Sequence, residues 1–161
     1  MTEPRIEILH SKKLVGKRLK MSFADDRTPE LWRSFMPERK LVGNQIGNNL
    51  FSLNIYNTIF TFHDINPNLE YGKLAAVEVS DFSGVPSNME KYILNGGLYA
   101  VFLHKGASSE FHVTFNFIYN VWFPESKYEV DHREHFELLG SKYKNNESDS
   151  EEEIWVPVKM K

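Results

Sequence analysis

Residues Gly97–Tyr143 read GLYAVFLHKGASSEFHVTFNFIYNVWFPESKYEVDHREHFELLGSKY and contain the elements from which the fold can be predicted. An apolar run over Leu98–His104 predicts a β-strand, and a turn then leads into a helix with aromatic residues on one face. Pro124 ends that helix, and a second strand follows at His135–Leu139. In this second strand Glu137 lies between two apolar residues, so the unit predicts an acidic residue close to an aromatic surface.

The chain before this stretch predicts the same order of elements. Alternating apolar residues predict one long strand or two within Ile6–Phe23, and a helix follows from Thr28, whose side chain we expect to cap it. Clean alternation over Leu50–Tyr56 predicts a half-buried strand, and Lys73–Phe82 predicts a further one. The second half repeats the series and ends in a strand over Glu151–Lys159, after an acidic linker.

This repetition predicts the architecture. We expect one domain over residues 1–161, built from two pseudo-symmetric strand–helix–strand–strand modules at about residues 1–85 and 90–161. A chain of 161 residues is long enough to bury a core of its own. The fold class we predict is therefore α+β, with an antiparallel sheet and helices on one face of it.

Composition and charge exclude several classes of protein. Basic residues are scattered along a chain of formal net charge −3, so we expect no nucleic acid as a direct partner. No apolar run is long enough to span a bilayer, and the amino terminus MTEPRIEI lacks the pattern of a signal peptide. We therefore expect no membrane contact and a cytoplasmic location. The lack of cysteine excludes disulfides, zinc–thiolate sites and a cysteine nucleophile.

One cluster of possible metal ligands lies at Asp131, His132, Glu134 and His135. The run is not helical, no second cluster accompanies it, and its spacing differs from that of the HExxH zinc motif, so we predict no metal site. The chain also lacks a glycine-rich phosphate loop and the nucleophile elbow of the serine hydrolases. We therefore predict no cofactor and assign no catalytic residue.

Three motifs of the second half resemble the GyrI-like small-molecule-binding domain, which is also the effector-binding half of AraC-type and BmrR-type bacterial regulators. The motifs are Tyr99-Ala100-Val101-Phe102-x-x-Lys105-Gly106, then Ile118-Tyr119-x-x-Trp122-Phe123-Pro124-x-Ser126-x-Tyr128, then Phe136-Glu137. These motifs match those of the family in order and spacing. The first half of the chain matches the architecture of the family more than its amino-acid sequence. Since nothing here is left for a helix-turn-helix, we expect similarity to the stand-alone members.

The resemblance implies a central cleft between the two modules that binds hydrophobic, often cationic compounds around a glutamate. Carried onto this sequence, the glutamate is Glu137, and Trp122 and Tyr128 are cleft aromatics. Trp32 and Tyr56 are the corresponding candidates of the first half. This sequence departs from the family at the second residue after the glutamate, where it has leucine and many relatives have tyrosine, so the implied cleft lacks one hydroxyl.

The strand pattern alone leaves other interpretations open. Alternation with Phe136 and Leu138 would place Glu137 in solvent, whereas the resemblance implies that the sheet face without helices forms the cleft. Trp122 belongs either to the core under its helix or to the cleft, and Tyr128 is either a lid or a surface residue.

We expect the chain to bind a hydrophobic or cationic small molecule and to be a monomer or a weak homodimer. A carboxylate beside aromatic walls suits a cation, because the rings attract positive charge through their faces. One alternative is hydrolysis of strained electrophiles such as cyclopropanoids, held for some relatives, with Glu137 and a cleft aromatic activating water. Another is a protein-interaction role, as the family's link to gyrase inhibition suggests, for which the acidic run Glu147–Glu153, interpreted as a solvated loop, is the candidate surface.

Overall fold

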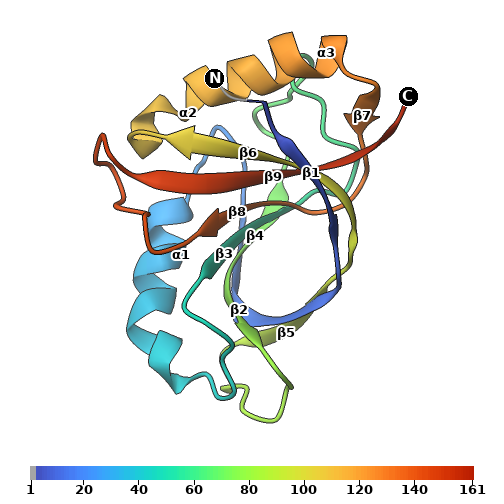
Figure 1. Cartoon of the computed structure of the whole chain (residues 1–161). Coiled ribbons are helices and arrows are strands. Elements are labelled where there is room, and N and C mark those ends of the chain that lie inside the picture. The colour runs from blue at the N-terminus through green and yellow to red at the C-terminus, as the bar shows by residue number, and fades with distance from the viewer. Residues whose placement is uncertain (1–2) are drawn as a thin grey trace.

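The computed structural model describes residues 3–161, which form a nine-stranded antiparallel sheet with two main helices packed on it (Figure 1). The strands are β1 (Arg5–Leu9), β2 (Lys12–Met21), β3 (Leu50–Ile55), β4 (Tyr71–Val79), β5 (Glu90–Leu94), β6 (Gly97–Lys105), β7 (Tyr128–Val130), β8 (His135–Leu139) and β9 (Glu151–Met160). The helices are α1 (Thr28–Phe35), α2 (Phe111–Phe117) and the short α3 (Phe123–Glu125), with a π-helical turn (Ile118–Trp122) joining α2 to α3. The predicted α+β class and antiparallel sheet are confirmed.

The order of the strands follows the repetition in the sequence. It is β1-β6-β9-β8-β3-β4-β2-β5, and the short β7 pairs with β9. Each strand of one half has a counterpart in the other: β1 corresponds to β5, β6 to β2, β9 to β4 and β8 to β3. If every strand is replaced by its counterpart, the same order is obtained when read from the other edge of the sheet. The two halves therefore have an approximate twofold arrangement. Each half also lends its first strand to the other, because β1 pairs with β6 and β5 pairs with β2. Strands β3 and β8 meet at the centre.

Two glycines allow the backbone to approach closely where the sheet is most crowded. A Cβ on Gly16 of β2 would lie 1.9 Å from the carbonyl oxygen of Ala75 on β4. A Cβ on Gly96, between β5 and β6, would lie 2.1 Å from the carbonyl oxygen of Leu9 at the end of β1. The two strand connections, β1 to β2 and β5 to β6, therefore touch, and they hold the curled ends of the sheet together.

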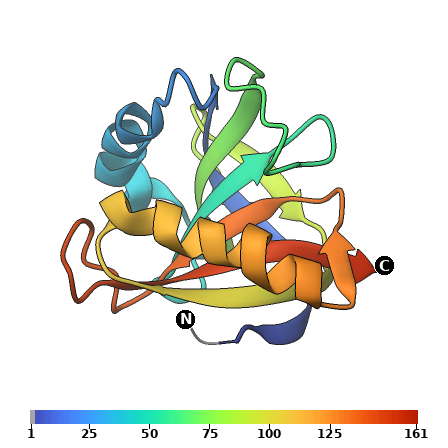
Figure 2. The same ribbon diagram turned by 90° about the horizontal axis from the view of Figure 1, so that it is seen from above.

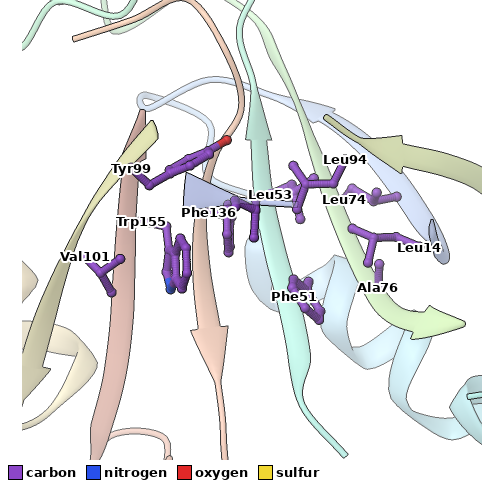
Figure 3. Packing of buried hydrophobic residues seen from close by; sticks show 11 residues of the cluster. Leu14, Phe51, Leu53, Leu74, Ala76, Leu94, Tyr99, Val101, Phe136 and Trp155 are labelled. Carbon is purple, nitrogen blue, oxygen red and sulfur yellow. The ribbon is translucent and has the colours of Figure 1, made fainter. Parts of the chain in front are cut away.

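The face of the sheet without helices is filled by the main hydrophobic core. Its members come from strands of both halves, and Figure 3 shows them crossing the sheet from Tyr99 and Trp155 to Leu14. The rings of Phe136 and Trp155 stack with centroids 5.1 Å apart. The curled sheet encloses these side chains, which form the hydrophobic core of this face.

The two helices cover different parts of the opposite face (Figure 2). Leu31 and Phe35 of α1 pack on Ala75 and Val77 of β4. The aromatic helix α2 and its π-helical turn pack on β6 and β9, with Ile118 and other residues buried against them. The centre of the sheet, between the helices, is left for the candidate site.

This arrangement corrects the expectation that the helix-free face forms the cleft. The same face that carries the helices carries Glu137, because its register partners across the sheet are Ser52 on one side and Ile154 on the other, and Ile154 packs under α2. Residues directly opposite in an antiparallel pair share a face. The helix-free face is occupied by core side chains such as Phe136, which alternate with Glu137.

Local details differ from the sequence prediction at two places. Thr28 does not cap α1; its backbone N–H and hydroxyl both donate to Oδ1 of Asp26, at 3.0 and 2.6 Å. The acidic run becomes strand β9 from Glu151 onward, and Glu152 is 4% exposed instead of solvated.

Among residues 3–161, no helix combines the length and the apolar character that crossing a bilayer requires.

Candidate functional site

A cavity of about 840 Å³ lies between α1 and α2, over the pairing of β3 and β8. This volume is within the range of small-molecule sites. Its wall is rich in aromatic side chains, which come from both helices, from the sheet and from the connections between these elements. They include Phe23, Trp32, Tyr56, Phe60, Phe62, Tyr71, Phe111, Phe115, Tyr119 and Tyr143.

The floor of the cavity follows from strand alternation. On β3, Ser52 and Asn54 point to the helix-bearing face, because their neighbours Phe51 and Leu53 belong to the core on the other face. On β8 the same alternation exposes His135, Glu137 and Leu139 to the cavity. The floor therefore combines polar side chains from both halves of the chain.

Residues 57–70, between β3 and β4, contribute a third wall. The ring of Phe62 stacks on Tyr119 of the π-helical turn, with centroids 4.9 Å apart and planes 9° apart. The ring of Phe60 lies 5.1 Å from that of Tyr56 and 5.4 Å from that of Tyr119. This connection therefore forms part of the cavity wall and contacts the π-helical turn that follows α2.

Glu137 is the carboxylate at the centre of the floor. It is half-buried, and within residues 3–161 its side chain makes no hydrogen bond or ion pair with another residue. A carboxylate in such surroundings interacts favourably with any cation that enters, since no protein cation neutralises it directly. The position is therefore a charge site open to a ligand.

Tyrosine hydroxyls around Glu137 stay protonated at neutral pH. Burial raises the pKa of Tyr71 to about 12, and the charges of Asp26 and Glu137 add to the effect. Burial is also the main reason why the pKa values of Tyr56 and Tyr119 lie above the usual range, and Glu137 contributes in both cases. The cavity thus presents neutral phenols, whose ring faces attract a cation.

His135 is a neutral part of the floor. Burial, together with the nearby charges of Arg133 and His132, lowers its pKa to about 3. Its ring contacts those of Tyr56 and Phe60, with centroids 5.2 and 5.1 Å away. At physiological pH it therefore acts as an uncharged aromatic residue and does not compete with a cationic ligand for Glu137.

A second carboxyl group, Glu152 of β9, lines the same cavity. Burial and, to a lesser extent, the charge of Glu137 raise its pKa to about 8, and Lys73 acts in the opposite direction. Its Oε1 is buried and has no hydrogen-bond partner within residues 3–161. Such an atom is costly to bury, so it is a position where a ligand can supply the missing contact.

The residues of the possible metal cluster have other partners. Asp131 accepts a hydrogen bond from Arg133 at 3.0 Å, and Glu134 accepts one from Tyr92 at 2.6 Å. His135 faces the cavity. Over the described residues 3–161, no three or more histidine, cysteine or acidic side chains are grouped as a metal ion would require.

The sequence profile of the GyrI-like small molecule binding domain matches residues 2–159, which is nearly the whole chain. The chain belongs to the GyrI-like family. Searches among curated proteins found no match.

Solved structures with the same fold are similar over almost the whole GyrI-like chain. The structure of SAV2435 bound to tetraphenylphosphonium has a TM-score of 0.73 and 17% identity, covering 98% of this chain and 94% of that one. The C-terminal domain of EcmrR has a TM-score of 0.70 and 14% identity, with coverage of 99% and 98%. A hydrolase from Listeria innocua has a TM-score of 0.62 and 12% identity, with coverage of 98% and 92%.

Three of the five residues selected from the sequence lie together in the cavity of this GyrI-like domain. They are Glu137, Trp32 of α1 and Tyr56 at the end of β3. Their position on the wall is a structural observation, and their role in binding stays a prediction.

Trp122 and Tyr128 lie outside the cavity wall, which corrects the expectation that they point into a cleft. Trp122 is buried under its own helix, where its ring meets Phe102 edge-on and its indole N–H donates to Glu3 at 3.0 Å. Tyr128 stacks on Trp122 with ring centroids 6.0 Å apart. The alternative interpretation of Trp122, as a core residue, is the one that the structure supports.

Several residues of the wall were missed in the sequence. Glu152 could have been found, because it is in phase with Ile154 and Val156, the apolar residues of the inner face of its strand. Phe60 and Phe62 had no such signal, since they lie between strands in a segment without periodicity.

Proposed function

We propose that this GyrI-like domain binds a lipophilic cation in the cavity between α1 and α2, and that Glu137 is the charge partner. The observation that carries the proposal is the half-buried Glu137 carboxylate, which has no cationic partner among residues 3–161 and is surrounded by aromatic rings. Both features lower the free energy of a bound cation.

The apolar part of the ligand has its own support. A cavity of about 840 Å³ with a wall rich in aromatic side chains buries several rings of a ligand, and burial of apolar surface supplies affinity without directionality. SAV2435, which shares the fold, was solved with tetraphenylphosphonium, a cation whose charge is enclosed by four phenyl groups. This complex makes tetraphenylphosphonium a suitable first probe.

A thermal-shift experiment tests the proposal. Tetraphenylphosphonium should raise the Tm of the wild type in a concentration-dependent way, because a ligand that binds only the folded state stabilises it by mass action. The neutral compound triphenylphosphine oxide, which has similar rings and no charge, should produce a smaller shift. Glu137→Gln should lose most of the shift with the cation and keep the shift with the neutral compound.

Glu129→Gln is the matched control, because Glu129 is an exposed residue of β7 and does not line the cavity. It should behave as the wild type with both compounds. Equal shifts for wild type and Glu137→Gln with tetraphenylphosphonium would contradict the role of Glu137, and no shift with any lipophilic cation would contradict the proposed function.

Hydrolysis is the second candidate function, and one arrangement favours it. Glu137 shares the cavity with the protonated phenols of Tyr56 and Tyr119, so a general base and hydrogen-bond donors surround one space. A protein with the same fold is a hydrolase from Listeria innocua. Under this function Glu137→Gln should abolish turnover of a strained electrophile and leave its binding largely intact.

The protein-interaction role has weaker support. The acidic run was its candidate surface, yet Glu152 is buried and Glu153 accepts hydrogen bonds from Arg5 and Trp155. Within the acidic run, the exposed acidic side chains are Glu147 and Asp149 of the loop before β9. We therefore place a small-molecule ligand before a protein partner.

A further inference from the structure

Glu152 gives the cavity a second acidic position whose chemistry differs from that of Glu137. Glu137 pairs in register with Ile154, and Glu152 is two residues from Ile154 on the same strand. The two acidic residues are thus diagonal neighbours on one face, a relation that places Cα atoms about 7–8 Å apart. Both carboxyl groups can reach the same ligand.

The buried atom without a partner at this second position is a hydrogen-bond acceptor. Oε1 of Glu152 is buried, lines the cavity and has no hydrogen-bond partner within residues 3–161. A ligand that pairs with the ionised Glu152 carboxyl must therefore bring N–H or O–H donors.

Neighbouring side chains leave Glu152 free for such a ligand. His104 is its register partner on β6, but the ring nitrogens of His104 are engaged by Thr114 at 2.7 Å and by the carbonyl oxygen of Ala107 at 2.9 Å. The other titratable groups that act on Glu152 are Glu137, Lys73 and Tyr143. None of these groups makes a hydrogen bond to Glu152 within the described residues, so its carboxyl remains unpaired.

We propose that Glu152 forms a second acidic subsite that selects a flat cation bearing N–H groups, an amidinium or a guanidinium, over a fully substituted ammonium or phosphonium. This inference rests on the proposed function, since it names the class of cation that the cavity takes. A planar, delocalised cation fits between aromatic walls and offers several donors in a fixed geometry. A fully substituted cation leaves Oε1 of Glu152 unsatisfied.

Binding of such a cation displaces a proton from Glu152. At neutral pH a carboxyl with a pKa of about 8 is mostly protonated, and a bound cation favours the ionised form. The proton passes from the carboxyl oxygen to the buffer, and the carboxylate then accepts hydrogen bonds from the ligand. Affinity should therefore rise with pH up to about 8, by as much as roughly tenfold per unit, and then level off.

Isothermal titration calorimetry with two matched compounds tests this inference. Biphenyl-4-carboxamidinium and biphenyl-4-yl-trimethylammonium have the same rings and the same charge, and only the first has N–H donors. At pH 7, in phosphate and in Tris, the wild type should bind the amidinium at least about tenfold more tightly, because charge-assisted hydrogen bonds are the strong ones. It should release close to one proton per bound amidinium.

Two variants test whether Glu152 causes the amidinium preference and the proton release. In Glu152→Gln the preference for the amidinium should fall to within about threefold and proton release should vanish, whereas binding of the trimethylammonium compound should persist. Glu151→Gln is the matched control, because Glu151 precedes Glu152 on β9 and does not line the cavity. It should retain both the preference and the proton release.

The outcomes separate the two proposals. Equal affinity of the wild type for both compounds, or an unchanged preference in Glu152→Gln, would overturn the second subsite and leave the proposed function standing. Failure of both compounds to bind the wild type would overturn the two proposals together. Should Glu152→Gln not fold, the wild type still decides, since proton release that persists undiminished above about pH 9 would exclude Glu152 as its source.

Discussion

Glu137 and Glu152 show how the position of a single residue sets its charge. Both are on strands of one sheet face and both line the same cavity, yet Glu152 is almost fully buried while Glu137 is half-buried. Burial disfavours the ionised form of the Glu152 carboxyl, and the negative charge of Glu137 makes ionisation of Glu152 more costly. Two acidic residues that line one cavity therefore differ in burial and in their surroundings.

His135 should make stability depend on pH. Its folded pKa of about 3 lies below the ordinary value of 6.5, so the unfolded chain binds a proton first as pH falls, and stability is lost between about pH 6.5 and 3. Between pH 7 and pH 5 the wild type should lose about 1–2 kcal/mol more unfolding free energy than His135→Gln. Urea denaturation at both pH values measures this difference, and parallel losses in the two proteins would contradict it.

Variants of Trp32 and Trp122 should separate ligand binding from stability. Trp32→Ala removes a ring from the cavity wall and should weaken binding of tetraphenylphosphonium by about tenfold, because a ring face contributes roughly 1 kcal/mol or more to a desolvated cation. Trp122→Phe removes the hydrogen bond to Glu3 and should destabilise the fold by about 1 kcal/mol with an unchanged Kd. Calorimetry and thermal unfolding of both variants check this, and the reverse pattern would mean that Trp122 faces the ligand.

At the scale of elements, the pairing of strands decides which side chains reach the cavity. The register of β3, β8 and β9 brings Ser52, Glu137 and Ile154 into one row of the sheet, under the gap between the helices. A shift by one residue would move Glu137 into the core, since side chains alternate between faces. The site therefore depends on the register of the central strands as much as on its own residues.

The β2–β4 pair tests whether the close approach of two strand backbones contributes to stability. Gly16→Ala should destabilise the protein by about 2–4 kcal/mol, because its Cβ would collide with the backbone of β4 at 1.9 Å. Gly72→Ala, in the same pair of strands, meets only the flexible side chain of Arg18, at 3.4 Å, and should change stability by less than about 1 kcal/mol. Denaturant unfolding compares them, and equal effects would show that the close approach has no role.

The elements themselves were predictable from the sequence, because alternation in the strands and the aromatic face of the second helix reflect local burial. The strand of Glu137 was predicted with the bounds that the structure gives, His135–Leu139. The side of the sheet on which the cavity lies was not predictable, since alternation separates two faces without saying which one the helices cover. The place of Trp122 depends on contacts with Phe102 and Glu3, distant in the sequence, so its interpretation had to wait for the fold.

At the scale of the molecule, the site lies where the two halves meet. The first half supplies Trp32 and Tyr56, the second supplies Glu137 and Glu152, and β3 and β8 join them at the centre of the sheet. The helix-free face holds the core, so the site can exchange a ligand without opening that core. This division explains how a small domain keeps both a large cavity and a continuous hydrophobic core.

The central claim is that the Glu137 carboxylate holds a lipophilic cation, and the Kd of tetraphenylphosphonium measured by calorimetry tests it most directly. The account predicts a measurable Kd for the wild type and a Kd at least about tenfold higher for Glu137→Gln, a loss of about 1.4 kcal/mol. Triphenylphosphine oxide should show no such difference between the two proteins. An identical Kd of the cation for wild type and Glu137→Gln would contradict the account.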